Sequence, residues 1–160
     1  IHGLIRREGE RLLPPDIQAL VEELYHLAGE RDMKRLLEVG ERCMWEGLDN
    51  ARPTKRLGDI GHAVQSCAES YGFAVVRDYV GHGVGRKLHE DPAVPNYGTQ
   101  GHGLKLLPGM TLAIEPMINI KGSAVVVRPD GTVLTKSGSL SAHFEHTVAI
   151  TASGPVILTR

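Results

Sequence analysis

The sequence is poor in aromatic residues and in cysteines. Tryptophan, tyrosine and phenylalanine together make up 4% of its 160 residues, so we expect a core of aliphatic side chains. The two cysteines, Cys43 and Cys67, are too few for a disulfide scaffold. Both lie in segments with helical spacing, which favours reduced thiols in a cytoplasmic protein. The length is typical of one domain. The small number of cysteines excludes a small fold that is stabilised mainly by disulfide bonds.

The sequence also lacks an excess of one charge and any long apolar run. Eighteen lysines and arginines against nineteen aspartates and glutamates give a formal net charge of -1. No basic block stands out, so we expect no specific nucleic-acid partner. No stretch approaches the roughly 20 apolar residues of a membrane span, and no signal-like segment opens the sequence, so we expect no membrane partner. The sequence starts at Ile1 rather than methionine, and we expect an upstream segment to have been removed.

Apolar spacing divides the sequence into a helical first part and a strand-rich second part. Helices are predicted over 14–30, 32–47 and 58–71, and strands over 73–80, 110–120, 123–128, 132–136 and 142–151. A Pro-Asp-Gly turn at 129–131 joins two of these strands as a hairpin. Residues 81–109 are rich in glycine and proline and predict a long loop, which in a compact domain is usually functional. Helices followed by mostly antiparallel strands predict an α+β fold.

Histidines give the first sign of chemistry, because six of the eight lie from position 62 onward. His82 lies in a Gly-His-Gly-Val-Gly motif directly after a predicted strand. The glycines on both sides allow a backbone or a ligand to approach the imidazole closely. The alternative is a flexible loop with an incidental histidine.

Two glutamates lie inside apolar, strand-like segments. Strand alternation places Glu115 on one face with apolar neighbours, where a buried carboxylate is costly unless a cation or good donors compensate. The alternative is an edge strand with Glu115 pointing to water, and Pro116 supports an edge position. Glu145 shares a strand face with His143, and the alternative here is the polar face of a half-exposed strand.

Together, His82, Glu115 and Glu145 offer nitrogen and oxygen donors that suit a divalent first-row ion such as Mn, Fe, Co or Zn. A metal would also explain why carboxylates are tolerated inside apolar strands. His89, seven residues after His82, is a candidate proton donor or hydrogen-bond partner of a substrate, although its sequence context also fits a surface turn. No Gly-x-Ser-x-Gly motif is present and neither cysteine lies in a setting typical of a nucleophile, so serine or cysteine hydrolysis has no support.

Three motifs, in this order, resemble type I methionine aminopeptidases. They are the Gly-His-Gly-Val-Gly and His-Glu-Asp-Pro stretch within 75–92, Ile-Glu-Pro-Met within 107–117, and Phe-Glu-His-Thr within 138–148. The last two forms favour methionine aminopeptidases over the related prolidases. The resemblance implies a pita-bread fold in which His82, Glu115 and Glu145 bind one or two divalent ions. It also implies that Glu145 bridges the ions or takes the proton of the attacking water, that His89 contacts substrate and transition state, and that His2 lines the active site.

The sequence departs from the family pattern in one place. The family takes two further ligands from an aspartate-rich hairpin, whereas residues 12–33 look helical here. An ungapped count places the two aspartate positions on Val21 and Asp32, so Asp32 is the candidate for a surviving ligand. We therefore expect one truncated pita-bread domain over residues 1–160, divergent over 1–32 and family-like over 33–152. An uncovered apolar face of such a domain predicts a homodimer or a completing partner chain.

Two functions follow from the match and the departure. The first is a metal-dependent aminopeptidase that removes the N-terminal methionine of peptides and nascent proteins in the cytoplasm. The second is a catalytically impaired binding or regulatory module, or a subunit that needs a partner chain. Metal-dependent hydrolysis of a short methionyl peptide separates the two.

Overall fold

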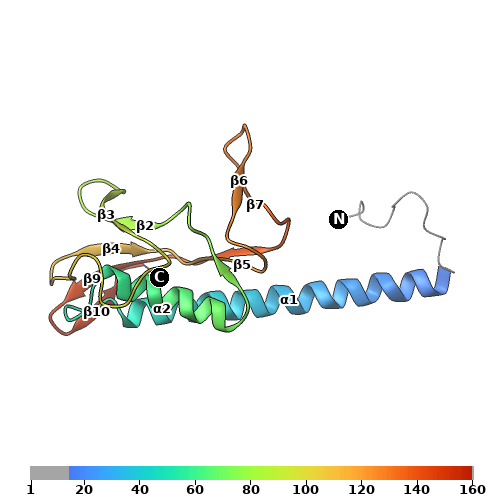
Figure 1. Ribbon diagram of the computed structural model, residues 1–160, viewed down its shortest axis with the longest axis horizontal. Helices are drawn as coiled ribbons and strands as arrows, with labels where there is room; N and C mark the ends of the chain where they lie inside the picture. The colour runs from blue at the N-terminus through green and yellow to red at the C-terminus, as the bar shows by residue number, and fades with distance from the viewer. Residues whose placement is uncertain (1–14, 160) are drawn as a thin grey trace. The chain divides into compact units, whose positions relative to one another are not determined.

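The structure is a computed structural model and describes residues 15–159. The chain forms two compact units, Ile1–Lys34 and Arg35–Arg160. Helix α1 (Pro15–Asp49) begins in the first unit and ends in the second, and helix α2 (Leu57–Ser70) follows it (Figure 1). Of the described helices, none combines the length and apolar character that crossing a bilayer requires.

The strands lie in the second unit and form three antiparallel sheets. A five-stranded sheet has the order β10-β9-β4-β2-β3, a three-stranded sheet the order β1-β5-β8, and β6 pairs with β7 as a hairpin that stands away from the other strands (Figure 1). The bounds are β1 Ala74–Val75, β2 Gly81–Gly83, β3 Glu90–Val94, β4 Thr111–Ile114, β5 Met117–Asn119, β6 Val125–Val127, β7 Val133–Thr135, β8 Ser141–His143, β9 His146–Thr151 and β10 Gly154–Ile157.

Helix α2 and the end of α1 cover one face of the sheets. One apolar cluster contains Met44 of α1, Ile60 of α2, Leu112 and Ile114 of β4, and Val148 of β9, all almost fully buried. Each such side chain contributes about 1.5–3 kcal/mol on leaving water. The core is aliphatic, as the composition predicts. Because Leu112 and Ile114 point toward the helices, Ala113 and the residue after Ile114 point to the opposite face of the sheet.

Glycine allows helix α1 to approach the strands closely. A Cβ atom at Gly40 would lie 2.9 Å from Cδ2 of Phe144, well inside van der Waals contact. Phe144 packs against this apolar cluster and against a second one, which contains Leu36, Val39 and Cys43 of α1. Helix α1 therefore packs against the chain segment between β8 and β9 through the contact of Gly40 with Phe144.

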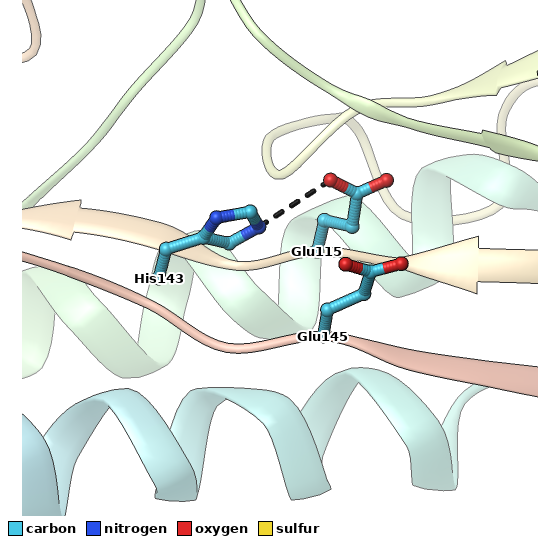
Figure 2. Close-up of side chains that lie close together, drawn as sticks. All are labelled: Glu115, His143 and Glu145. Carbon is cyan, nitrogen blue, oxygen red and sulfur yellow. Dashed lines mark ion pairs between the residues drawn. The ribbon is translucent and has the colours of Figure 1, made fainter. Parts of the chain in front are cut away.

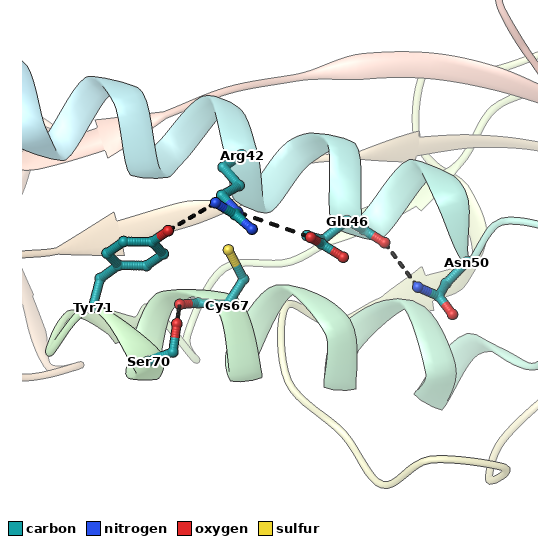
Figure 3. Close-up of polar contacts among 6 residues, drawn as sticks. All are labelled: Arg42, Glu46, Asn50, Cys67, Ser70 and Tyr71. Atoms are coloured by element: carbon teal, nitrogen blue, oxygen red, sulfur yellow. Dashed lines mark hydrogen bonds and ion pairs between the residues drawn. The ribbon is translucent and has the colours of Figure 1, made fainter.

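Polar contacts also join α1 to α2 (Figure 3). The Arg42 guanidinium donates to the Tyr71 hydroxyl at 2.9 Å and lies 3.9 Å from the Glu46 carboxylate. Cys43 and Cys67 are both free thiols. Burial, followed by the neighbouring Cys67 thiol, raises the pKa of Cys43 well above its usual range. Cys43 is therefore an unreactive core residue.

Asp59 fixes the start of α2 to the loop that follows β3. One oxygen of its carboxylate accepts the Arg56 backbone N–H at 2.7 Å, and the other accepts the Gly101 backbone N–H at 2.7 Å. Burial acts to raise the pKa of Asp59, but these two hydrogen bonds outweigh burial and the pKa is lowered. The aspartate thus joins segments that are 42 residues apart in sequence.

The sequence-based assignment of elements is partly wrong. The helices expected over 14–30 and 32–47 are one continuous helix, because Gly29 costs only about 1 kcal/mol inside a helix and does not have to end it. The loop expected over 81–109 contains strands β2 and β3, and the strand expected over 73–80 is reduced to β1. The helix near 58–71 and the β6–β7 hairpin are confirmed.

Candidate metal centre

His82 lies on a paired strand rather than in a flexible loop. Its strand, β2, hydrogen-bonds to β3 on one side and to β4 on the other. A Cβ atom at Gly81 would meet the carbonyl oxygen of Ala113, and one at Gly83 would meet that of Asp91. The glycines around His82 are therefore required by close packing of backbones, and they hold the imidazole in place.

The protonation of His82 follows from its hydrogen bond. Nδ1 lies 2.9 Å from the Gly83 carbonyl oxygen, which can only accept, so Nδ1 carries the proton in this hydrogen bond. The other ring nitrogen, Nε2, lies 3.1 Å from Oε1 of Glu115. In the neutral ring this nitrogen has a lone pair, so two electron-rich atoms face each other. Such a contact is stable only with a proton or a cation between the two groups.

Glu115 and Glu145 lie opposite each other across one antiparallel ladder. β4 pairs with β9 so that Ile114 faces His146, and β5 pairs with β8 so that Met117 faces His143. The same register continued through the gap places Glu115 directly opposite Glu145. Directly opposed side chains share one face of a sheet, and like charges in that position destabilise it.

Oxygen atoms of the two glutamates and a nitrogen of His143 come together at this point (Figure 2). One donor atom from each of Glu115, His143 and Glu145 lies within 4.8 Å of the others. Nε2 of His143 is 3.3 Å from Oε2 of Glu115. Figure 2 shows all three side chains on the side of the strands away from helix α1. The apolar packing described above lies on the helix side.

The buried carboxylate of Glu115 has an oxygen that a cation could bind. Its side chain is 12% exposed, and Oε1 is buried without any hydrogen bond of acceptable geometry to the described residues, despite its short distance to His82. The short distance to His82 is a contact between the two groups and not a hydrogen bond of acceptable geometry. Since a buried carboxylate oxygen without a partner costs free energy, the donor set fits a divalent cation.

A cavity of about 620 Å³ adjoins this group on the β2–β3 side. His82 and His89 both line it, and their ring centroids are 4.1 Å apart. His89 is exposed, with Lys87 and Asp91 also at the cavity wall. The candidate substrate contact His89 is thus next to the candidate ligand His82.

Other sequence-based candidates lie elsewhere. His2 is outside the described residues. Asp32 lies in helix α1 within the first unit, where its carboxylate is 3.9 Å from the Arg31 guanidinium. The edge-strand alternative for Glu115 is wrong, because β4 and β5, which flank it, each lie in the middle of a sheet and its side chain is 12% exposed. His143 is not among the ligands predicted from the sequence, although its position on one strand face with Glu145 is a signal for it.

Comparison with known proteins agrees with this geometry. Residues 22–152 match the model of metallopeptidase family M24. Methionine aminopeptidase 1 of Bacillus subtilis is 53% identical over 130 residues, which are 81% of this chain and 52% of the relative. The methionine aminopeptidase of Aquifex aeolicus is 49% identical over 82% of this chain and 52% of its own length. This chain therefore spans about half the length of the curated relatives it matches.

Solved structures show the same fold. The methionine aminopeptidase of Rickettsia prowazekii has a TM-score of 0.79 and 46% identity over 81% of this chain and 53% of that one. The enzyme of Thermotoga maritima has a TM-score of 0.77 and 53% identity over 79% of this chain and 51% of that one. The α+β pita-bread class is thereby confirmed, and a divalent metal is indicated by the family together with the donor group. The chain belongs to metallopeptidase family M24.

Proposed function

We propose that this chain carries the metal-binding half of an aminopeptidase that removes the N-terminal methionine of peptides and nascent proteins. One observation carries the proposal: Glu115 and Glu145 oppose each other on one sheet face, and a buried oxygen of Glu115 has no hydrogen-bond partner among the described residues. The similarity to methionine aminopeptidases supports the choice of substrate.

His82, Glu115 and Glu145 are the proposed metal ligands. A bound divalent ion supplies a water of lowered pKa and polarises the peptide carbonyl. The proton on Nδ1 of His82 holds its ring in the tautomer whose Nε2 faces the carboxylates. The Asn96 side chain donates to the Glu115 backbone oxygen at 2.7 Å and fixes the strand at that residue.

Glu145 and His89 are the proposed catalytic residues. Glu145 is exposed, so one of its oxygens can accept the proton of the attacking water. His89 lines the cavity beside His82, where its ring can donate a hydrogen bond to the carbonyl oxygen as negative charge develops there. In the same proposal the cavity receives the N-terminal residue of the peptide, with His2 as a further substrate contact.

Hydrolysis of a Met-Ala-Ser peptide, with Mn, Co, Fe or Zn added in turn, tests the proposal. The expected result is a metal-dependent rate that Glu145→Gln lowers by roughly 10²–10⁴-fold, the usual contribution of general acid–base catalysis. Glu69→Gln, an exposed glutamate of α2, is the matched control and leaves the rate unchanged. Equal rates for Glu145→Gln and the wild type refute the proposal.

A second candidate function has its own observation. Within residues 15–159, the donor group contains two glutamates and a histidine but no aspartate. Fewer anionic ligands mean weaker metal binding, which favours a catalytically impaired binding module or a subunit that acts with a second copy or another chain. A folded sample that gives no turnover with any of the four metals, and that sediments as a dimer or complex, supports this candidate. A cytoplasmic location is proposed for both functions.

A further inference from the structure

We propose that His143 is a protein donor to the metal, so that this chain binds the ion with two imidazoles and two carboxylates. The inference rests on the metal-dependent function proposed above. The ligand set implied by the sequence resemblance contains His82, Glu115 and Glu145 and does not include His143. The structure adds His143 through its position in the sheet.

The register of the strands explains why His143 reaches the site. His143 faces Met117 across the β5–β8 ladder, which makes it the diagonal neighbour of Glu115 on the same sheet face. His82 faces Ala113 across the β2–β4 ladder and is the diagonal neighbour of Glu115 in the other direction. Diagonal neighbours are within reach of long side chains. Glu115 is therefore flanked by one imidazole on each side, at 3.1 Å and 3.3 Å.

The distances are close to those of a coordination sphere. Zinc lies about 2.0–2.2 Å from imidazole nitrogen and carboxylate oxygen, so donors around one ion are separated by roughly 3–4.4 Å. The donor atoms of Glu115, His143 and Glu145 lie within 4.8 Å of one another. His82 contacts Glu115 at 3.1 Å but lies outside this group of three, so a single ion shared by all four residues requires rotation of the exposed His143 and Glu145 side chains.

A simple ion pair between His143 and Glu115 explains less. The His143 side chain is 48% exposed, and an ion pair with such an exposed partner contributes little to stability. It also leaves Oε1 of Glu115 without a hydrogen bond. A divalent ion accounts for both carboxylate groups, since two carboxylates balance its charge and the neutral imidazoles add donors without adding charge.

The second imidazole has a consequence for metal choice. Imidazole suits Zn, Cu, Fe and Ni, whereas carboxylate and water ligands suit Mn and Mg. A site with two imidazoles therefore favours Zn over Mn more strongly than a site with one. His143 is then a selectivity determinant as well as a ligand.

Metal titration of the purified chain tests the proposal without reference to activity. Zn and Mn affinities are measured by calorimetry for the wild type, His143→Gln and His146→Gln. His146 is the matched control, since its imidazole is 3.2 Å from the Thr159 hydroxyl and lies on the other sheet face. The expected result is a Zn affinity that is more than about 100-fold weaker for His143→Gln, beyond the roughly 10–100-fold loss of a residue that only supports a ligand, with a smaller loss for Mn and no change for His146→Gln.

A spectroscopic readout separates a ligand from a mere neighbour. In the Co²⁺-loaded wild type, the proton NMR spectrum should contain two strongly shifted imidazole N–H signals, from His82 and His143. His143→Gln should lose one of them. Because a variant can fail to fold, protection of His143 from diethyl pyrocarbonate by Zn is measured on the unaltered chain by mass spectrometry.

The possible results separate the assignment of His143 as a ligand from the proposed aminopeptidase function. Unchanged Zn affinity and an unchanged number of shifted signals in His143→Gln overturn the inference, and so does the absence of protection of His143 by Zn. If Glu145→Gln still abolishes metal-dependent hydrolysis in that case, the proposed function stands without the inference. If His143→Gln weakens Zn binding but the wild type hydrolyses no peptide with any metal, the ligand assignment stands and the aminopeptidase function falls.

Discussion

Replacement of Asp59 by asparagine perturbs one buried group that joins α2 to the loop containing Gly101. The carboxylate accepts the Arg56 and Gly101 backbone N–H groups, one on each oxygen, and the residue is 6% exposed. An asparagine side chain has one oxygen, which can accept from one of the two backbone N–H groups, and its NH₂ group then faces the second N–H group. The variant thus leaves one backbone N–H without a partner and weakens the second bond.

The magnitude follows from those two hydrogen bonds. A buried donor without a partner costs about 1–3 kcal/mol, and a bond to a charged group contributes about 1.5–3 kcal/mol. Because the second bond is weakened and not lost, we expect Asp59→Asn to lower the free energy of unfolding by about 2–3 kcal/mol at neutral pH. Urea denaturation followed by circular dichroism measures this difference.

The loss should depend on pH. Since the pKa of Asp59 is lower in the folded state than in the unfolded chain, the carboxylate stabilises the fold fully above the unfolded value, near 3.9. This contribution decreases as the pH falls through the folded pKa. The wild type and Asp59→Asn should therefore converge in acid. Asp78→Asn, at an exposed position, should change the free energy of unfolding by less than about 0.5 kcal/mol. A gap between wild type and Asp59→Asn that is as large at about pH 3 as at pH 7 refutes the reasoning.

Three further predictions use other contacts. Gly81→Ala should destabilise the fold by about 3 kcal/mol in urea titrations, because its Cβ would collide with the Ala113 carbonyl oxygen; a stability equal to wild type contradicts this packing. Gly40→Ala gains about 1 kcal/mol of helix propensity but displaces Phe144, so calorimetry should show weaker metal binding even where stability is little changed. Zn at 100 times its dissociation constant should stabilise the wild type by about 2.7 kcal/mol, seen as a thermal shift that Glu115→Gln abolishes.

The sequence correctly predicts those helices and hairpins whose residues are spaced within a few positions of one another. The helix near 58–71 and the hairpin around 129–131 depend on spacing and turn residues within a few positions. β2 and β3 do not follow from the local pattern, since Gly81 is explained by the backbone of β4 and Gly83 by the backbone of β3, and not by a loop. The contact of Gly81 with Ala113 spans about 30 residues of sequence and lies in no local window.

The site shows the same division between local and distant information. Residue type and strand alternation are enough to select His82, Glu115 and Glu145, and the strand registers place them on one sheet face, although the closest donor group joins Glu115 and Glu145 to His143 and not to His82. His143 required the register of the β5–β8 ladder, because a diagonal contact exists only once the pairing of two strands is fixed. The opposition of Glu115 and Glu145 likewise depends on two ladders that share one register.

Both glutamates occupy a short interval where the chain leaves one sheet and enters the other. Glu115 falls between β4 and β5, and Glu145 falls between β8 and β9. The separation of the two carboxylates is therefore set by the ladder that joins these strands, which keeps one register through the interval. An ion held by both carboxylates would tie the two strands together at the point where they pass from one sheet into the other.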